Sequence, residues 1–191
     1  MTLRQSFFVI VITVAVTASA ATAQRPASSC RGAEYRSLDF WVGRWDVTNA
    51  KSQPAGTSTI EVVSDGCAIV ERFAGPGRKY VGTGLHYFDA ATRKWLQYFA
   101  DNRPMLTIMQ GETIANGILY RWEIVDPKGA RIPKRYAVTA EANGVRQHGE
   151  RSNDGGKTWV TEFDLRYKKA TVLVRLKPDF TSSVIAFSAP Y

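Results

Sequence analysis

Short segments in which apolar and polar residues alternate run along the chain from Gly43 onward, and helical spacing is almost absent there. In segment 118–125, Tyr120 and Trp122 fall on one side and Arg121 on the other. Side chains of a β-strand point alternately to its two faces, so this period of two predicts strands with one wet face.

A second clear alternation covers residues 159–167. One face carries Trp159, Phe163, Leu165 and Tyr167, and the other carries Glu162, Asp164 and Arg166. Comparable segments are centred on Trp45, Val62, Ile69, Leu85, Gln97, Ile108, Val138, Gln147 and Val174. The pattern predicts about ten or eleven strands, with one more possible at residues 184–187.

Turn-forming dipeptides such as Asp65-Gly66, Asn116-Gly117 and Asn143-Gly144 separate these segments. Regular short strands joined by tight turns favour an antiparallel, up-and-down lipocalin-like barrel over a two-sheet sandwich, because closure removes exposed strand edges. Residues 35–41 are expected to form a short helical turn that plugs one end. The expected fold class is therefore all-β, with a single barrel domain over residues 24–191.

The first 23 residues have the order typical of a secretory signal peptide. Arg4 precedes the apolar run 7–15, and small residues lead to Ala23. This run is too short to span a bilayer. We therefore expect cleavage after Ala23, a periplasmic or secreted location, and no membrane span.

Composition and charge exclude some classes of partner but do not identify a ligand. The formal net charge is +8, but the cations are spread over several strands and turns, so we expect a basic surface and no nucleic-acid partner. Neither the oligomeric state nor a cofactor is indicated. The two cysteines, Cys30 and Cys67, both follow the expected cleavage point, and in an oxidising compartment we expect them to form a disulfide rather than a metal site.

Two short motifs fit this fold. The segment 152–159, SNDGGKTW, has the spacing of an Asp box, in which Asp154 caps the turn and Trp159 anchors the hairpin in the core. One copy predicts a structural hairpin rather than a sialidase. The triplet Gly43-Arg44-Trp45 begins many lipocalins and other calycins, in which a late-strand arginine packs on the tryptophan; Arg166 or Arg175 is the candidate.

Several segments together resemble a family of secreted bacterial proteins of unknown function with calycin-like barrels. They are LDFWVGRWDV at 38–47, DGCAIVE at 65–71, the pieces at 84–89, 94–97 and Asp101, and the Asp box. The resemblance implies a barrel, export, and pairing of an N-terminal cysteine with the cysteine after Asp-Gly. The family has no settled activity, and the chain departs from the family pattern beyond Lys169.

Sequence motifs for catalysis are missing. The chain has no G-x-S-x-G, no H-E-x-x-H and no glycine-rich phosphate loop. The two histidines, His86 and His148, stand alone in strand patterns, and we expect ordinary strand histidines.

Candidate ligand-binding residues are polar groups that share a strand face with large apolar ones. Glu71 lies between Ile69 and Phe73, Gln97 lies between Trp95 and Phe99, and Gln147 follows Val145. If these faces point inward, they place a few polar groups in an aromatic cavity, as in many small-molecule sites.

Three functions compete. The favoured one is binding of a small, largely apolar molecule, with Trp95, Phe99 and Trp122 as walls and Glu71 and Gln97 as orienting groups. The second is a haem protein that uses His148. The third is an isomerase, cyclase or hydrolase in which burial raises the pKa of Glu71 for acid–base chemistry.

Overall fold

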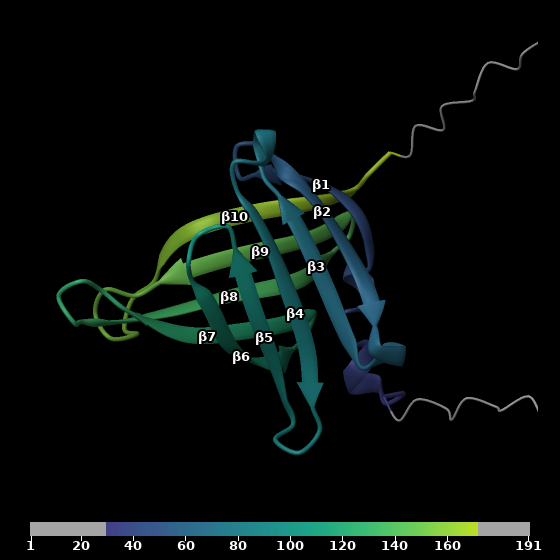
Figure 1. Cartoon of the computed structure of the whole chain (residues 1–191), viewed down its shortest axis with the longest axis horizontal. Coiled ribbons are helices and arrows are strands. Elements are labelled where there is room, and N and C mark those ends of the chain that lie inside the picture. The colour runs from purple at the N-terminus through teal and green to yellow at the C-terminus, as the bar shows by residue number, and fades with distance from the viewer. Residues whose placement is uncertain (1–29, 172–191) are drawn as a thin grey trace, which may run out of the picture.

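The computed structural model describes residues 30–171, which form a closed barrel of ten antiparallel strands (Figure 1). The strands are β1 (Gly43–Asn49), β2 (Pro54–Val63), β3 (Ala68–Ala74), β4 (Val81–Asp89), β5 (Lys94–Asp101), β6 (Leu106–Ile114), β7 (Gly117–Val125), β8 (Arg131–Glu141), β9 (Gly144–Arg151) and β10 (Val160–Lys169). The predicted all-β barrel is confirmed. The predicted signal peptide and the strands expected near Val174 and at 184–187 lie outside the described residues.

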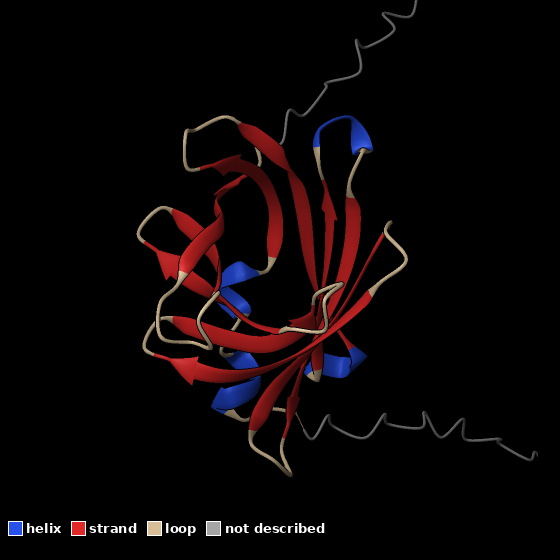
Figure 2. Cartoon of the chain, turned by 90° about the vertical axis from the view of Figure 1, so that its left-hand side faces the viewer, coloured by secondary structure: helices blue, strands red, loops and turns tan. Residues whose placement is uncertain are grey.

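Each strand pairs with its neighbour in the chain, and β1 pairs with β10 to close the ring (Figure 2). The closing register places Val47 opposite Tyr167 and Trp45 opposite Lys169. Closure pairs the backbone groups that an open sheet would leave at its edges. No helix among the described residues has the length and apolar character needed to cross a membrane.

One end of the barrel is closed by two 3-10 turns, η1 (Ala33–Arg36) and η2 (Asp39–Trp41). Leu38 and Trp41 are completely buried there. The disulfide between Cys30 and Cys67 ties the chain before η1 to the β2–β3 connection, which includes the short turn η3 (Ser64–Gly66). Both the predicted helical turn and the predicted disulfide are confirmed.

Trp45 lies at this closed end, as the Gly-x-Trp triplet predicts, and its Nε1 donates a hydrogen bond to the carbonyl of Trp41 (2.7 Å). The cation that covers its ring is Lys169, whose Nζ lies 4.0 Å from the ring centroid and donates to the Val42 carbonyl. Of the two expected arginines, Arg166 was wrong and Arg175 is not tested. Arg166 faces outward, where it pairs with Asp164 and Glu141, and Arg175 is beyond the described residues.

The Asp-box turn forms as predicted between β9 and β10. Asp154 accepts hydrogen bonds from the Thr158 backbone (2.8 Å) and from the hydroxyls of Thr158 and Ser152. The core position expected for Trp159 was wrong, because its ring is half-buried on the outside of the barrel under the Arg135 guanidinium.

The physical reason for this error is a register shift between Thr161 and Phe163 in β10. The shift places one extra residue, Glu162, in the strand, so the alternation of faces changes at that point. Phe163 faces inward as predicted, whereas Trp159 moves to the outer face.

Cross-strand ion pairs cover the outer face of the second half of the barrel. They include Arg121–Glu112, Arg135–Glu150 and Arg146–Asp164, all between neighbouring strands. Opposite charges in register support the pairing of these strands modestly.

Candidate functional site

The predicted face of β5 points into the barrel. Trp95 and Gln97 are each 2% exposed and Phe99 is partly buried against the core, while Tyr98 between them is 39% exposed. Glu71 of β3 is also inside, at 3% exposure. The sequence left the choice of face open, and the structure places the polar group among the aromatic ones.

Glu71 lies in a layer of polar side chains near the middle of the barrel. Its Oε1 accepts hydrogen bonds from the Ser58 hydroxyl (2.8 Å) and the Tyr167 hydroxyl (3.2 Å), and the Gln147 side chain also stabilises its charge. Burial nevertheless raises the pKa of Glu71 to about 7, because the loss of water outweighs these hydrogen bonds.

His86 of β4 belongs to the same interior and was missed as a site residue. It is completely buried, and its Nδ1 forms a hydrogen bond with the Tyr120 hydroxyl (2.9 Å). Burial lowers the pKa of His86 to about 3, so the ring is neutral at physiological pH. The alternation of Gly82, Gly84, His86 and Phe88 along β4 was the available signal.

Tyr136 of β8 connects the two sides of the layer. Its hydroxyl donates to Oε1 of Gln97, and its ring stacks on Tyr120 at a centroid distance of 5.1 Å. Burial raises the pKa of Tyr120, Tyr136 and Tyr167 well above the ordinary tyrosine value. Their hydroxyls therefore remain protonated donors.

Several buried polar atoms in this interior have no hydrogen-bond partner. Among residues 30–171 they are His86 Nε2, Trp41 Nε1 and Trp95 Nε1. Whichever nitrogen of His86 carries the proton, Nε2 keeps an unused donor or acceptor. Leaving such groups unsatisfied is costly, so a cluster of them indicates a place where another polar group fits.

The inner face of β4 packs closely under His86 and Gln97. A methyl group at Gly84 would lie 3.1 Å from Nε2 of Gln97 and 3.2 Å from Nε2 of His86, with the Phe99 ring at 3.3 Å. Glycine at this position therefore lets an amide, an imidazole and an aromatic ring converge over the backbone of β4.

The end of the barrel opposite η1 and η2 is more open. Partly buried aromatic rings line it, among them Phe73, Phe99, Trp122 and Phe163. Trp122 packs edge-on against Tyr136, at a centroid distance of 6.1 Å. We call this end, from the β1–β2 turn to the β9–β10 turn, the mouth. Two open grooves of about 630 and 550 Å³ flank its β1–β5 side, where Gly56 and Phe73 contribute to their walls.

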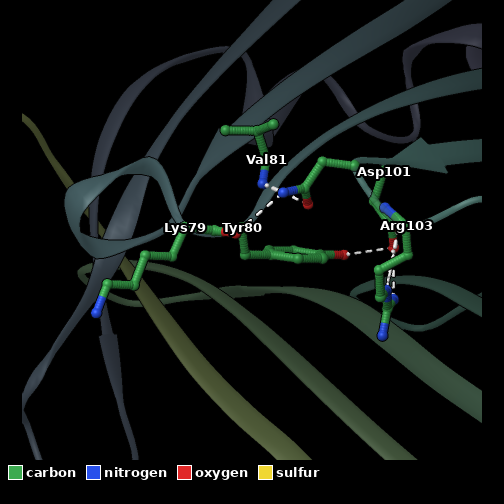
Figure 3. A network of polar contacts seen from close by, with 6 residues as sticks. Lys79, Tyr80, Val81, Asp101 and Arg103 are labelled. Atoms are coloured by element: carbon green, nitrogen blue, oxygen red, sulfur yellow. Dashed lines mark hydrogen bonds and ion pairs between the residues drawn. The ribbon is translucent and has the colours of Figure 1, made fainter.

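A polar cluster stands on that side of the mouth (Figure 3). Arg103 forms an ion pair with Asp101, and Asp101 also accepts a hydrogen bond from the Tyr80 hydroxyl (3.2 Å). Burial, followed by the nearby Asp101 carboxylate, raises the pKa of Tyr80 to about 12. The Asp101–Arg103 pair is internally neutral, so it adds no net charge to the mouth.

His148 does not face the interior. Its neighbours Gln147 and Gly149 are buried, whereas its own Nε2 contacts the Thr161 hydroxyl (3.0 Å) on the outer face. The strand alternation that buries Gln147 turns His148 outward, so the haem hypothesis loses its ligand inside the barrel.

Fold and interior together define a class: a calycin-like β-barrel, closed at one end, with an aromatic interior crossed by a buried polar layer. No protein-family model matches the chain, and no curated protein is significantly similar to it.

Proposed function

We propose that this protein binds a small, largely apolar molecule inside the barrel, with a polar group of the ligand directed at the Gln97–His86 region. The observation that carries the proposal is the set of unsatisfied buried atoms, above all His86 Nε2, which lies where Gln97 and Phe99 converge over Gly84. A pocket of aromatic walls with a few convergent polar groups is the usual form of a small-molecule site.

The five residues expected from the sequence have different places in this proposal. Gln97 orients the ligand, and Phe99 and Trp122 form walls toward the mouth. Trp95 packs against Phe88 nearer the closed end, where it supports the site from below. Glu71 already accepts hydrogen bonds from protein hydroxyls, so we assign it no direct contact with the ligand; it polarises the hydroxyl groups of Ser58 and Tyr167.

Binding is tested with the neutral apolar fluorophore N-phenyl-1-naphthylamine. Phe99→Ala should weaken its affinity about three- to tenfold through lost apolar contact. Tyr98→Ala is the matched control, because Tyr98 is the adjacent residue on the outer face. This variant should bind the fluorophore with unchanged affinity. Equal effects of the two substitutions, or no binding by the unmodified protein, would contradict the proposal.

The polar contact is tested by native mass spectrometry of protein isolated from its own host. A co-purified small molecule should be bound in the unmodified protein and be reduced in Gln97→Ala. Gln110→Ala removes the same side chain from the exposed face of β6 and should leave occupancy unchanged. Retention by Gln97→Ala at full occupancy would remove Gln97 from the site.

A second candidate is acid–base catalysis by Glu71, favoured by the pKa of about 7 that burial gives this carboxyl. A group that titrates near the working pH can both accept and donate a proton. Glu71→Gln preserves the size of the side chain but cannot exchange a proton. Chemical conversion of the co-purified molecule that this substitution abolishes, with binding retained, would favour the enzyme over the binding protein.

We further propose that the chain is exported through the N-terminal segment and belongs with the secreted bacterial family that it resembles. The Cys30–Cys67 disulfide supports this location, because disulfides persist in oxidising compartments. N-terminal sequencing of protein from the host should begin at Gln24. A start at Met1 in protein from the cytoplasm would contradict it.

A further inference from the structure

The mouth also carries a charged cluster on its β8–β10 side, which involves Lys134, Arg151 and Glu162. The strand register shows which way two of these residues point. Lys134 pairs with Trp122 of β7 and with Arg151 of β9, two residues from the inward-facing pair Tyr136 and Gly149. Successive residues alternate between faces, so Lys134 and Arg151 lie on the inner side of the barrel, at its rim.

Glu162 reaches these cations because it is the extra residue at the register shift of β10. Its Oε2 lies 2.8 Å from Nζ of Lys134, and its Oε1 lies 4.0 Å from Nε of Arg151. The side chains of Lys134 and Glu162 are only 17% and 26% exposed. Bulges commonly re-aim a side chain beside a functional site.

The charges of this cluster do not balance. Two cations share one carboxylate, which leaves one positive charge on the inner rim of the mouth. Across the mouth, Asp101 and Arg103 neutralise each other. A partly buried charge that lacks a full counter-charge favours an anion from outside, and a lysine beside an arginine supplies donors for it.

We propose that the ligand of this barrel carries an anionic group in addition to the polar group that faces Gln97 and His86: its largely apolar body enters past Trp122, while its anion lies between Lys134 and Arg151. This inference rests on the proposed function and specifies the ligand class for it. Glu162 competes with the ligand for the same cations, so it limits the affinity and holds the cations in place when the mouth is empty.

The test compares decanoate with decan-1-ol at pH 8, each displacing N-phenyl-1-naphthylamine from the full mature protein. The two probes share a chain and differ in charge. Decanoate should bind more tightly than decan-1-ol. Lys134→Met should weaken decanoate binding about tenfold and leave decan-1-ol unchanged, since a charge-assisted hydrogen bond is lost only with the anion.

Two further variants sharpen the result. Glu162→Gln removes the competing carboxylate and should tighten decanoate binding, a gain that a merely destabilised protein would not show. Arg131→Met is the matched control, because Arg131 is three residues from Lys134 but faces outward and pairs with Glu123 at 77% exposure. Arg131→Met should change neither the affinity for decanoate nor the affinity for decan-1-ol. Arg151→Met repeats the test if Lys134→Met lowers the melting temperature.

The outcomes separate the two proposals. Displacement by decan-1-ol and decanoate with equal affinity, both insensitive to Lys134→Met and Glu162→Gln, overturns the anion site while interior binding stands. Failure of the fluorophore and of both probes to bind overturns interior binding itself.

Discussion

The closed end and the mouth of this barrel are built from the same kinds of residue but differ in how completely protein groups surround those residues. At the closed end, Trp45 is covered by Lys169, bonded to Trp41 and 2% exposed. At the mouth, Phe99 and Trp122 keep part of their rings exposed. Aromatic side chains that contact protein on every side contribute to stability, whereas those with an open face remain available to a ligand.

Between these ends lies the polar layer, and it has the features of both. Glu71 and Tyr136 are hydrogen-bonded to protein groups, whereas His86 Nε2 is not. The aromatic rings at the closed end therefore contribute mainly to stability, whereas the middle of the barrel also holds a polar atom, His86 Nε2, that a ligand could satisfy.

The largest expected effect comes from removing one aromatic ring from each end. Trp45→Ala should lower the free energy of unfolding by about 3–5 kcal/mol, as for other fully buried aromatic residues. Phe99→Ala should lower it by about 1–2 kcal/mol, because the ring is only partly buried. Urea unfolding followed by far-UV circular dichroism measures both. Equal losses would show that the mouth is as tightly packed as the base.

The disulfide should matter nearly as much, and only at one end. Replacing both Cys30 and Cys67 by alanine frees a loop with a sequence separation of 37, which should cost about 4 kcal/mol. Hydrogen exchange in residues 33–41 should accelerate first. Uniform acceleration that includes the β9–β10 turn would argue against an independently secured base.

The polar layer should be visible in the pH dependence of stability. The pKa of Glu71 is raised to about 7, so its protonated form favours the fold below pH 4.5, and that stability is lost as pH rises toward 7. The pKa of His86 is lowered to about 3, so its contribution is complete above pH 6.5 and is lost as pH falls through 6.5 toward 3. Between pH 4.5 and 6.5 the two effects oppose each other.

Glu71→Gln should expose the histidine effect. In that range the unmodified protein should change little, whereas the variant should lose about 1.4 kcal/mol per pH unit on acidification. Glu61→Gln, an exposed carboxylate on β2, is the control and should keep the original profile. A flat profile for Glu71→Gln would mean that His86 is more hydrated than its burial indicates.

The smallest effect is expected at the Asp-box turn, which shapes the mouth without lining it. Asp154→Ala should lower the melting temperature by about 2–4 °C through lost turn hydrogen bonds, and Asp154→Asn should lower it less. Binding of the fluorophore should stay the same in both. Weaker binding at an unchanged melting temperature would make this turn part of the ligand site.

Local pattern by itself determined the barrel, the plugging turn and the Asp-box hairpin. The period of two in segments such as 118–125 depends only on strand geometry, and turn dipeptides such as Asn116-Gly117 act over a few residues. Compartment chemistry was enough to pair Cys30 with Cys67. These features need no knowledge of distant contacts.

Tertiary structure decided what the interior contains. Closure of the whole ring decides which face of β5 points inward. It also brings His86 of β4 into contact with Tyr120 of β7 within the barrel. One extra residue in β10 turned Trp159 outward and Glu162 toward Lys134, against a regular alternation. A bulge reverses side-chain direction without changing the composition of a strand, so its consequences become visible only once neighbouring strands fix the register.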